Sequence, residues 1–387
     1  MSDADPRPLA GITVVDLTRI LAGPYCTLVL ANLGARVIKV EQPRIGDFAR
    51  GIGPFVGGKS LYFAALNYDK ESIALDLKSP DDRAIFDELL DTADVLVENF
   101  RPGTMERLGY GWDAVHARWP RLVYGAASGF GQTGPLRARR AYDMVVQAMG
   151  GILSLTGPRG GPPARVGISI GDIAAGLFLT VGIQAALVKR AQTGEGTFVD
   201  VAMLDCQLAI LENALTAHLV TGVVPEPLGT RHPNIAPFQV FEAGDGERLV
   251  ICAGHDDVFE RVCAVLGAPA MAQDPRFLTT DSRRVHVDDL DRELTALLRA
   301  RSAGEWLDLL EKAGVPCAPV NTVADAAHMP QVAARHMIVD IADPKIGTLG
   351  VAGNPIKMSG VPERETRRPP PELDADRAAI LARLRRR

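Results

Sequence analysis

The sequence predicts an α/β protein, with an open parallel sheet in a large domain and a smaller α+β domain beside it. Three observations indicate this fold. The chain has 387 residues, which is long for one hydrophobic core. Short apolar runs alternate with helical stretches along its first half, as in βαβ units. Prolines then crowd a stretch typical of a domain boundary, at Pro225, Pro227, Pro233 and Pro237.

The first forty residues contain one βαβ unit. Ile12–Asp16 is a short apolar strand candidate, and an apolar helical stretch covers Tyr25–Leu33. Gly34 suits the C-cap of that helix, and Arg36–Glu41 follows as the second strand. Two strands joined by a helical crossover of this length are parallel.

The same alternation continues along the large domain. Further strands are expected at Ser72–Asp76, Asp94–Glu98, Leu122–Ala126 and Phe198–Met203. Helical stretches are expected near Ser79 and Gly111 and over Asp172–Ala191 and Asp205–Val220. An open sheet with helices on both faces places its ligand crevice at the carboxyl ends of the strands.

A smaller α+β domain is expected next. It contains a predicted hairpin, Phe238–Phe241 with Arg248–Cys252, and helices at Val258–Leu266, Val287–Ala300 and Ala303–Ala313. The chain then ends in a charged helix at Ala375–Arg386. We therefore expect the large domain over residues 1–222, the small domain with its linkers over 223–322, and a return to the large domain over 323–387.

Composition excludes several classes of protein. The net charge is −5 and the pI is near 5.9, so nucleic acid, which needs a basic face, is not expected as a partner. The N-terminus has no secretion signal, and the longest apolar stretch, Ile173–Val188, is too short and mixed to span a bilayer. Five scattered cysteines are typical of reduced thiols, so we expect a cytoplasmic protein without a membrane partner.

Familiar site motifs are incomplete or missing. The stretch Gly129–Gly134 matches G-x-G-x-x-G after a strand, but Pro135 follows where a dinucleotide site needs a helix start. No H-E-x-x-H motif or close His/Cys cluster occurs, so no metal site is expected. No G-x-S-x-G nucleophile elbow occurs either.

Basic residues occur on or just beyond the predicted strand ends, at Lys39, Lys78, Arg101, Arg107 and Arg140. Because these ends line the ligand crevice of an open parallel sheet, cations there suit a phosphorylated ligand such as a nucleotide or coenzyme A. Ordinary surface charge is the alternative for any one of them.

Asp172 follows Gly171 and precedes a long apolar helix, and its carboxylate has two interpretations. As an N-cap, it accepts N–H bonds from the first helical turn. As a nucleophile, it stays ionised at the positive end of the helix dipole and attacks a carbonyl to form an acyl intermediate. The residues alone leave both interpretations open.

An ordered set of short motifs resembles the class III CoA-transferase family over almost the whole chain. The motifs are Pro8–Thr18 with Ala22–Pro24, Leu33–Glu41, Val97–Gly103, Ser128–Gly131, Gly134–Pro135, Ala141–Asp143, Gly171–Asp172 and Thr193–Gly196 with Asp200–Asp205. Each motif alone is weak, but their order and spacing together are specific. This family also contains the α-methylacyl-CoA racemases.

The resemblance implies a Rossmann-like large domain and an interlocked homodimer, in which each chain threads the ring of the other. It implies that Asp172 is the nucleophile and that acyl-CoA is a substrate, with no tightly bound cofactor. By match of motif, the CoA contacts are Leu21, Gln42, Leu75, Lys78, Asn99, Phe100, Arg101, Arg107, Arg140, Tyr142 and Asp143. The match at Leu21 and Gln42 is imperfect, since some relatives have a polar residue and an arginine there.

The implied reaction moves CoA from an acyl-CoA donor to a small carboxylic acid, through aspartyl anhydride and aspartyl-CoA thioester steps. The stretch Gly229–Gln239 resembles the branch that uses succinyl-CoA with dicarboxylates. Arg231 or His232 would hold the distal carboxylate of the acceptor. The run of glycines found in oxalate-using relatives is missing here.

Two alternatives stay open. Racemisation in this family uses a histidine that precedes an aspartate, where this chain has Tyr142-Asp143. Tyrosine is a poor base at neutral pH, which disfavours that reaction. The second alternative is a CoA-binding protein without turnover, and the intact carboxylate of Asp172 argues against it.

Overall fold

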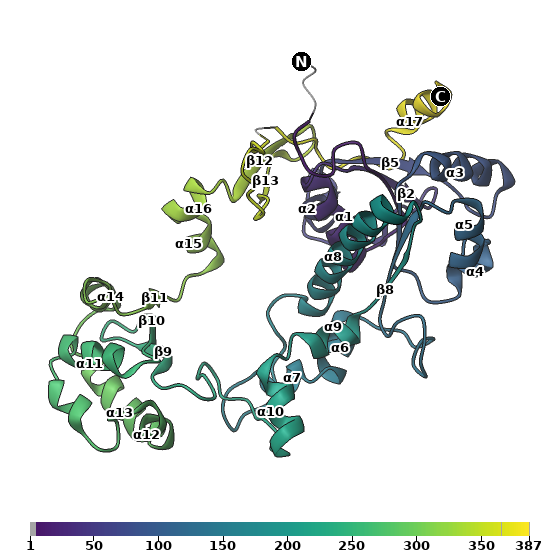
Figure 1. The fold of residues 1–387 in the computed structure, drawn as a ribbon. Helices are drawn as coiled ribbons and strands as arrows, with labels where there is room; N and C mark the ends of the chain where they lie inside the picture. Colours follow the sequence, from purple (N-terminus) through teal and green to yellow (C-terminus); the bar gives the residue numbers. More distant parts are fainter. Residues whose placement is uncertain (1–4, 365, 387) are drawn as a thin grey trace. The chain divides into compact units, whose positions relative to one another are not determined.

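The computed structural model describes residues 5–364 and 366–386. Its six-stranded sheet has the order β5-β2-β1-β6-β7-β8 (Figure 1). Every neighbouring pair of strands in this sheet is parallel. The predicted α/β fold with a large parallel sheet is therefore confirmed. The strands are β1 (Thr13–Asp16), β2 (Arg36–Glu41), β5 (Lys70–Ala74), β6 (Val95–Glu98), β7 (Val123–Ser128) and β8 (Phe198–Ala202).

The first βαβ unit forms as predicted, with α1 (Ala22–Asn32) between β1 and β2. The helix begins earlier than the expected Tyr25, and Pro24 lies inside its first turn. A proline is tolerated there, since the first N–H groups of a helix have no partner within it. The chain leaves the helix through Gly34, whose φ of 110° suits glycine.

Alternate side chains of the strands pack into two cores, one on each face of the sheet. On one face, Val14, Val37 and Val95 pack against α1 and α8 (Ile170–Thr193). On the other face, Val15 and Leu96 belong to a core that includes side chains of four helices. These are α3 (Pro80–Thr92), α4 (Thr104–Leu108), α5 (Trp112–Arg118) and α17 (Arg377–Leu384).

The longest apolar helix, α8, is longer than the stretch predicted from sequence. It has 24 residues and is long and apolar enough, by length and composition alone, to cross a membrane. The argument that its apolar stretch is too short to span a bilayer is therefore wrong. Leu179 and Ile183 are fully buried and face the core between α8 and the sheet, which accounts for part of its apolar character.

Shorter elements connect these layers. They are η1 (Phe48–Gly51), β3 (Phe55–Val56), β4 (Lys59–Ser60), α2 (Leu61–Asn67), α6 (Asp143–Met149), α9 (Met203–Ala209) and α10 (Asn213–Thr221). The expected single helix over Asp205–Val220 is wrong, because Glu212, with a φ of 44°, separates α9 from α10. An unpredicted antiparallel hairpin joins β12 (Ile338–Asp343) to β13 (Gly347–Ala352).

Residues near the C-terminal helix cover β5, which lies at one end of the sheet. Asp374 Oδ1 accepts the N–H of Ala74 at 2.7 Å, and Asp376 Oδ2 accepts the N–H of Ser72 at 2.9 Å. The N–H of Asp376 in turn donates to the carbonyl of Ser72 at 3.1 Å. These contacts occupy backbone groups that an edge strand otherwise offers to another chain.

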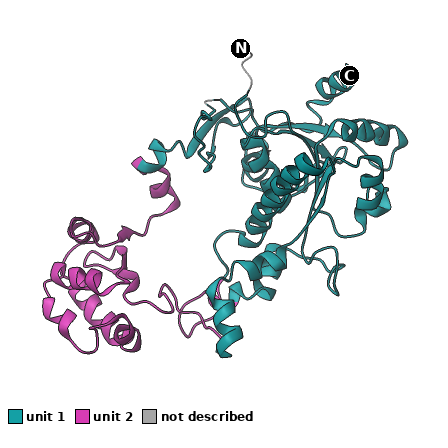
Figure 2. Ribbon diagram, in the orientation of Figure 1, with its two compact units in different colours: residues 1–153, 165–223, 331–387 teal, residues 154–164, 224–330 magenta. Residues whose placement is uncertain are grey.

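The chain divides into two compact units, which are coloured separately in Figure 2. Unit 1 holds residues 1–153, 165–223 and 331–387, and unit 2 holds residues 154–164 and 224–330. Two of the dividing points fall inside short helices, α7 (Ile152–Leu155) and α16 (Pro330–Ala334). The domain limits expected at 222 and 322 stay a prediction.

Unit 2 is built on a three-stranded antiparallel sheet of β9 (Phe238–Glu242), β10 (Arg248–Cys252) and β11 (Cys317–Pro319). Its core contains side chains from one face of α13, where Leu290, Leu294 and Leu298 recur at helical spacing. The other helices are α11 (Asp256–Val265), η2 (Pro269–Gln273), α12 (Thr280–Val285), α13 (Val287–Leu298), α14 (Ala303–Lys312) and α15 (Val323–Ala327).

Candidate functional site

Four neighbouring strands, β5, β2, β1 and β6, end at the same edge of the large sheet, and several expected CoA contacts follow them. Leu75 directly follows β5, and Gln42 directly follows β2. Leu21 lies in the loop after β1, and Asn99 directly follows β6. The structure therefore brings these residues to one edge, which is where an open parallel sheet has its ligand crevice.

The loops at this edge are tied together by Asn99. Its Oδ1 accepts the N–H of Arg19 at 2.8 Å, and its Nδ2 donates to the Arg19 carbonyl at 2.8 Å. The guanidinium of Arg19 also lies 4.7 Å from the ring centre of Phe100. Asn99 and Phe100 thus have structural contacts of their own, and the side chains of Leu21 and Leu75 are buried.

The predicted cations fall into two groups. Lys78, Arg101, Arg107 and Arg140 are exposed, as a contact with a charged ligand requires. Lys39 is fully buried, pairs with Asp47 at 2.9 Å and donates to the Thr18 carbonyl at 2.7 Å. The expectation that Lys39 faces a phosphorylated ligand is therefore wrong, because its ammonium stabilises the loop after β1 instead.

Asp172 lies in the first turn of α8 but is not its N-cap. The helix begins at Ile170 and its N-cap residue is Ser169. The N-cap interpretation of Asp172 is therefore wrong, and its carboxyl is not required to accept the first N–H groups of α8. The backbone N–H of Ala22, at the start of α1, hydrogen-bonds to this carboxyl instead.

Burial decides the charge of Asp172. Burial and the nearby carboxyl of Asp143 raise the pKa of Asp172 to about 7, while the N–H of Ala22 acts in the opposite direction. The expectation that the helix start keeps this group ionised well below neutrality does not hold. A helix dipole contributes about 0.3–1 kcal/mol, which is less than the cost of taking a carboxylate out of water.

Glycine allows the two helices of the site to approach closely. A Cβ on Gly176 of α8 would lie 2.7 Å from the carbonyl oxygen of Ala22 and 3.1 Å from the Tyr25 ring. The starts of α1 and α8 therefore meet backbone to backbone. This approach places the N–H of Ala22 beside the carboxyl of Asp172.

Tyr62 is a site residue that the sequence reasoning missed. It lies in α2, where Ser60 caps the helix by accepting the N–H of Phe63 at 3.0 Å. Burial raises the pKa of the Tyr62 hydroxyl, and the charges of Asp172, Asp47 and Asp143 add to that effect. The charge of Asp172 therefore acts on the Tyr62 hydroxyl, and only the N-cap serine signalled its helix in the sequence.

Tyr142 and Asp143 differ in exposure although they are adjacent. Tyr142 precedes α6 and is 76% exposed, whereas Asp143 is buried and accepts the N–H of Gly171 at 2.9 Å. Asp143 is therefore hydrogen-bonded to the residue that directly precedes Asp172. The ring of Tyr142 is exposed and can contact a ligand.

The two predicted acceptor contacts lie in unit 2. Arg231 donates to Asp288 at 2.6 Å and to Asp291 at 3.1 Å. The ring of His232 lies 5.2 Å from that of Phe238, and its Nδ1 accepts the N–H of Asn234 at 3.1 Å. Arg231 therefore has carboxylate partners within its own unit.

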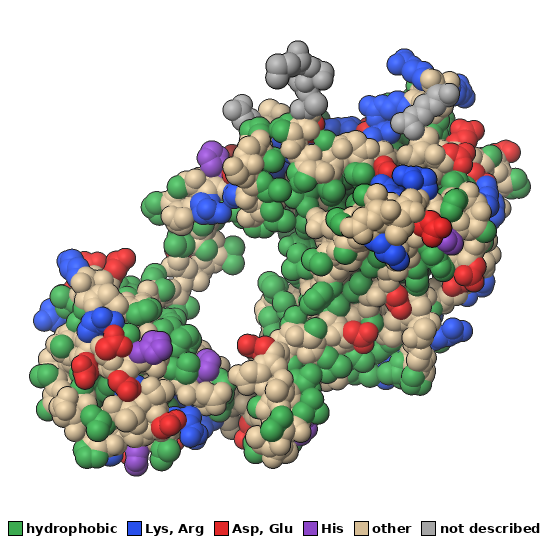
Figure 3. Space-filling model, viewed as in Figure 1, with side chains coloured by type: hydrophobic (Ala, Val, Ile, Leu, Met, Phe, Trp, Pro, Cys, Tyr) green, Lys and Arg blue, Asp and Glu red, His purple; other side chains and the backbone are tan. Residues whose placement is uncertain are grey.

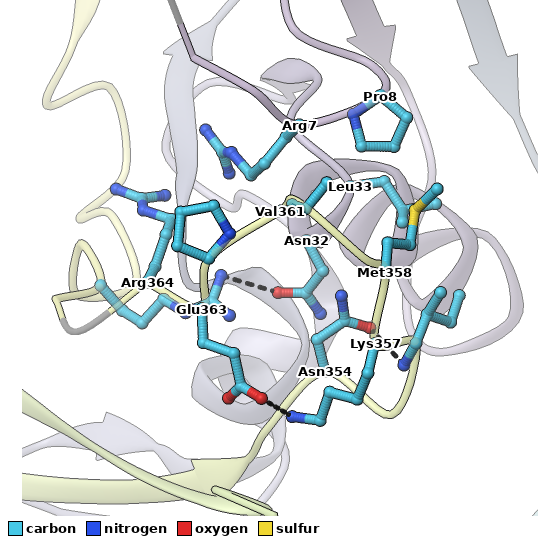
Figure 4. Close-up of a pocket in the computed structure, with 13 residues that line it drawn as sticks. Arg7, Pro8, Asn32, Leu33, Asn354, Lys357, Met358, Val361, Glu363 and Arg364 are labelled. Atoms are coloured by element: carbon cyan, nitrogen blue, oxygen red, sulfur yellow. Dashed lines mark hydrogen bonds and ion pairs between the residues drawn. The ribbon is translucent and has the colours of Figure 1, made fainter. Parts of the chain in front are cut away.

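Two of the cavities in unit 1 differ in their place on the sheet. One, of about 380 Å³, is lined by Glu98 at the carboxyl end of β6, by Arg101 beyond it, and by Tyr124 and Phe198 near the starts of β7 and β8. The other, of about 240 Å³, lies beside Asn32 and Leu33 at the end of α1, which is the opposite edge of the sheet. Figure 4 shows Lys357 and Glu363 ion-paired in that second cavity, at the other end of α1 from Ala22.

No metal site accompanies these groups in the part of the chain that the structure describes. Within residues 5–364 and 366–386, no three His, Cys, Asp or Glu side chains are placed to hold a metal ion. The stretch Gly129–Gly134 leads into a loop, and the next helix, α6, begins only at Asp143.

Residues 9–377 match the family described as CoA-transferase family III. The chain belongs to this family. The transferase is 48% identical over 379 residues to a protein of Acetobacter aceti named acetyl-CoA:oxalate CoA-transferase, with 97% of this chain and 96% of that protein covered. It is 37% identical to the mouse protein named succinyl-CoA:glutarate CoA-transferase, with 98% and 87% covered.

Solved structures agree with this placement. A CAIB/BAIF family protein from Brucella suis matches the transferase with a TM-score of 0.86 and 38% identity, covering 98% of this chain and 99% of that one. The predicted family is therefore confirmed, and the chain is a class III CoA-transferase enzyme that uses CoA thioesters. The alternative of a CoA-binding protein without turnover is set aside.

Proposed function

We propose that this enzyme transfers CoA from an acyl-CoA to a small dicarboxylic acid through a covalent intermediate on Asp172. The observation that carries the proposal is the place of this carboxyl. It is half-buried in the first turn of α8, beside the start of α1 and the sheet edge where the expected CoA contacts lie. A pKa of about 7 makes its anion more basic than an ordinary aspartate, which favours nucleophilic attack.

The proposed chemistry begins with the ionised form of Asp172. One carboxylate oxygen attacks the thioester carbonyl, the C–S bond breaks, and CoA leaves as a thiolate while a mixed anhydride forms. The thiolate then attacks the aspartyl carbonyl and releases the donor acid. The acceptor carboxylate attacks the aspartyl-CoA thioester, which breaks the C–S bond, expels the CoA thiolate and forms a second anhydride. The thiolate then attacks the acceptor carbonyl of this anhydride, which yields the acceptor acyl-CoA and restores the carboxylate of Asp172.

The CoA site is proposed along the loops after β5, β2, β1 and β6. The exposed cations Lys78, Arg101, Arg107 and Arg140 suit the phosphates, because charge-assisted hydrogen bonds to phosphate are the strong ones. The exposed ring of Tyr142 suits an apolar part of the ligand. Acyl-CoA enters as a substrate, so no tightly bound cofactor is proposed.

The acceptor is proposed to be a dicarboxylic acid. The relatives named above carry oxalate and glutarate in their names, and a third, from Chloroflexus aurantiacus, carries D-citramalate. All three acids have two carboxylates, one to react and one to be held. The missing glycine run does not decide against oxalate, since the oxalate-named relative is 48% identical.

The enzyme is proposed to act as an interlocked homodimer in the cytoplasm. Apolar side chains are exposed on α8 and α10, with Val181 at 62% and Val220 at 79%. Figure 3 shows hydrophobic side chains gathered over α8 and α9. A partner copy would cover such a surface. All five cysteines are unpaired, which fits a reducing compartment.

The first test is Asp172→Asn, which keeps the size of the side chain and removes the nucleophile. Transfer from succinyl-CoA or acetyl-CoA to a dicarboxylic acid is expected to fall at least roughly a thousandfold. Asp113→Asn is the matched control, since Asp113 is an exposed carboxylate in the first turn of α5. Turnover of ¹⁸O-labelled acceptor should also place ¹⁸O in Asp172, and an unlabelled Asp172 would overturn the covalent step.

A further inference from the structure

Asp143 holds the first turn of α8 from a different helix. Its Oδ1 accepts the N–H of Gly171 at 2.9 Å, which is one of the N–H groups that a helix start leaves without a partner inside the helix. Ser169, the N-cap residue of α8, makes no side-chain cap bond. Because Gly171 directly precedes Asp172, the bond from Asp143 fixes the backbone that carries the candidate nucleophile.

The second oxygen of Asp143 ties α6 to the segment that leads into α8. Oδ2 accepts Nε2 of Gln147 at 2.8 Å and lies 3.4 Å from the guanidinium of Arg165. Gln147 is fully buried, and its Oε1 accepts the N–H of Val166 at 3.2 Å. A carboxylate and an amide on successive turns of α6 thus hold this segment at Gly171 and at Val166.

Gly171 makes this contact possible. A Cβ at this position would lie 2.7 Å from Val146 Cγ2 and 3.1 Å from Asp143 Oδ1. A side chain at position 171 would therefore push against Val146 and the Asp143 carboxyl, so glycine allows the closest approach of α6 to the start of α8.

The groups that face Asp172 come from three helices. Asp143 on α6 supplies a second carboxyl, Ala22 on α1 offers a backbone N–H, and the charges of both carboxyls raise the pKa of Tyr62 on α2. Asp47 also acts on Tyr62, and Arg165 lies beside Asp143. Since burial and Asp143 both raise the pKa of Asp172, loss of the Asp143 charge lowers that pKa.

We infer that Asp143 is a positioning residue for the transfer reaction, because its carboxylate anchors the backbone at the start of α8 that carries Asp172. The inference rests on the proposed role of Asp172 as nucleophile. The CoA contact that the family resemblance assigned to Asp143 stays a separate prediction.

The test compares Asp143→Ala with the double variant Asp143→Asn/Gln147→Glu in the full-length enzyme. The first variant removes the anchor and the charge together. The second exchanges the amide and the carboxylate between positions 143 and 147. The new amide at position 143 accepts the N–H of Gly171 and donates to the new carboxylate at position 147, which accepts the N–H of Val166. The hydrogen bonds to Gly171 and Val166 are kept, the contact of position 143 with Arg165 is lost, and the negative charge moves one turn along α6.

For Asp143→Ala, kcat is expected to fall about a hundredfold with little change in the KM for acyl-CoA, since a misplacement of about 1 Å has that cost. The double variant should recover kcat to within about threefold, and the acid limb of its kcat profile should move about 1 pH unit lower. A folded double variant without recovered kcat, or with an unmoved acid limb, would overturn the inference. So would an Asp143→Ala variant in which only the KM for acyl-CoA rises.

A measurement without turnover separates this inference from the proposed nucleophile. Carbodiimide modifies protonated carboxyls, so the pH dependence of labelling at Asp172, followed by peptide mass spectrometry, reports its protonation directly. Labelling of the double variant should decline at lower pH than in the wild type. Activity in Asp172→Asn would refute the nucleophile, whereas unchanged labelling curves would refute the role of Asp143.

Discussion

At the scale of single residues, the site shows burial overriding local electrostatic rules. The start of a helix favours an anion, yet burial and Asp143 raise the pKa of Asp172 to about 7. A carboxyl with this pKa exists in both forms near neutral pH. Acid therefore inactivates the proposed nucleophile by protonating it. Protonation of Asp172 does not destabilise the fold, because burial disfavours the charged form.

Burial also raises the pKa of a second carboxyl, that of Glu98 at the end of β6. The side chain is 4% exposed, accepts the N–H of Phe100 at 2.6 Å, and burial raises its pKa to about 8. The unfolded chain releases this proton near pH 4.5, whereas the folded chain keeps it until about pH 8. Stability is therefore lost as the pH rises through that window, because the folded state binds more protons than the unfolded state.

Glu98→Gln should remove this pH dependence. The amide resembles the protonated carboxyl in shape, so the variant is expected to melt at least about 2 °C above the wild type at pH 8 and to approach it at pH 5. Thermal unfolding at several pH values measures the difference. Glu88→Gln, at an exposed glutamate of α3, is the control, and an equal gain in both variants would contradict the argument.

Arg231→Ala tests the predicted acceptor contact. If Arg231 holds the distal carboxylate, the KM for the acceptor should rise roughly tenfold or more, with little change in the KM for the donor. Steady-state kinetics with a dicarboxylate acceptor measures both. Arg276→Ala is a control, because this arginine of unit 2 is also ion-paired, with Asp274 at 2.6 Å and Glu293 at 2.9 Å. Equal changes in both KM values would refute the contact.

From the sequence, the position of a residue relative to the strands can be predicted more readily than the side chains that it contacts. Asp172 and the cations after β5 and β6 can be identified because strand ends can be read from apolar runs. The burial of Lys39 cannot, because it depends on Asp47, a carboxylate from a later loop. Tyr62 gives no signal, since its position near Asp172 exists only in the folded chain.

At the scale of elements, periodicity and turn residues predict the βαβ pattern and the hairpin of unit 2, and both form. Helix starts are less predictable. Pro24 conceals the beginning of α1, and Asp172 resembles a cap although α8 begins at Ile170. Both errors arise because the groups that stabilise a helix start come partly from elsewhere, as Asp143 shows.

Gly176→Ala tests the close approach of α1 and α8. Alanine is favoured over glycine by about 1 kcal/mol inside a helix, but overpacking against the Ala22 carbonyl costs about 1–3 kcal/mol. We expect lower stability in thermal unfolding and a roughly ten- to hundredfold slower transfer, because the N–H of Ala22 moves from Asp172.

Gly304→Ala is the matched control for this substitution. Gly304 lies in α14, and a Cβ there would meet nothing within 4 Å. This variant should be as stable as the wild type or more stable, with unchanged transfer. A Gly176→Ala enzyme with wild-type kinetics would show that the approach of the two helices does not serve the site.

At the scale of the whole molecule, the apolar surface of α8 predicts association. The enzyme should have about twice the 41.4 kDa mass of one chain in sedimentation or light scattering. Val181→Lys should weaken this assembly, since a charge would enter a covered apolar surface. Val285→Lys, at a similarly exposed valine of α12, should not, and a monomeric wild type would refute the dimer.

The hydrogen bonds from β5 to Asp374 and Asp376 can form only late in synthesis of the chain on the ribosome. Ser72 and its partner Asp376 are separated by 304 positions in the chain. At about 5–20 residues per second, the edge strand waits roughly 15–60 s between its own synthesis and that of the aspartates that occupy its N–H groups. During this interval the nascent sheet has an open edge, which makes early binding of a chaperone, or pairing with a neighbouring nascent chain, a kinetic competitor of folding.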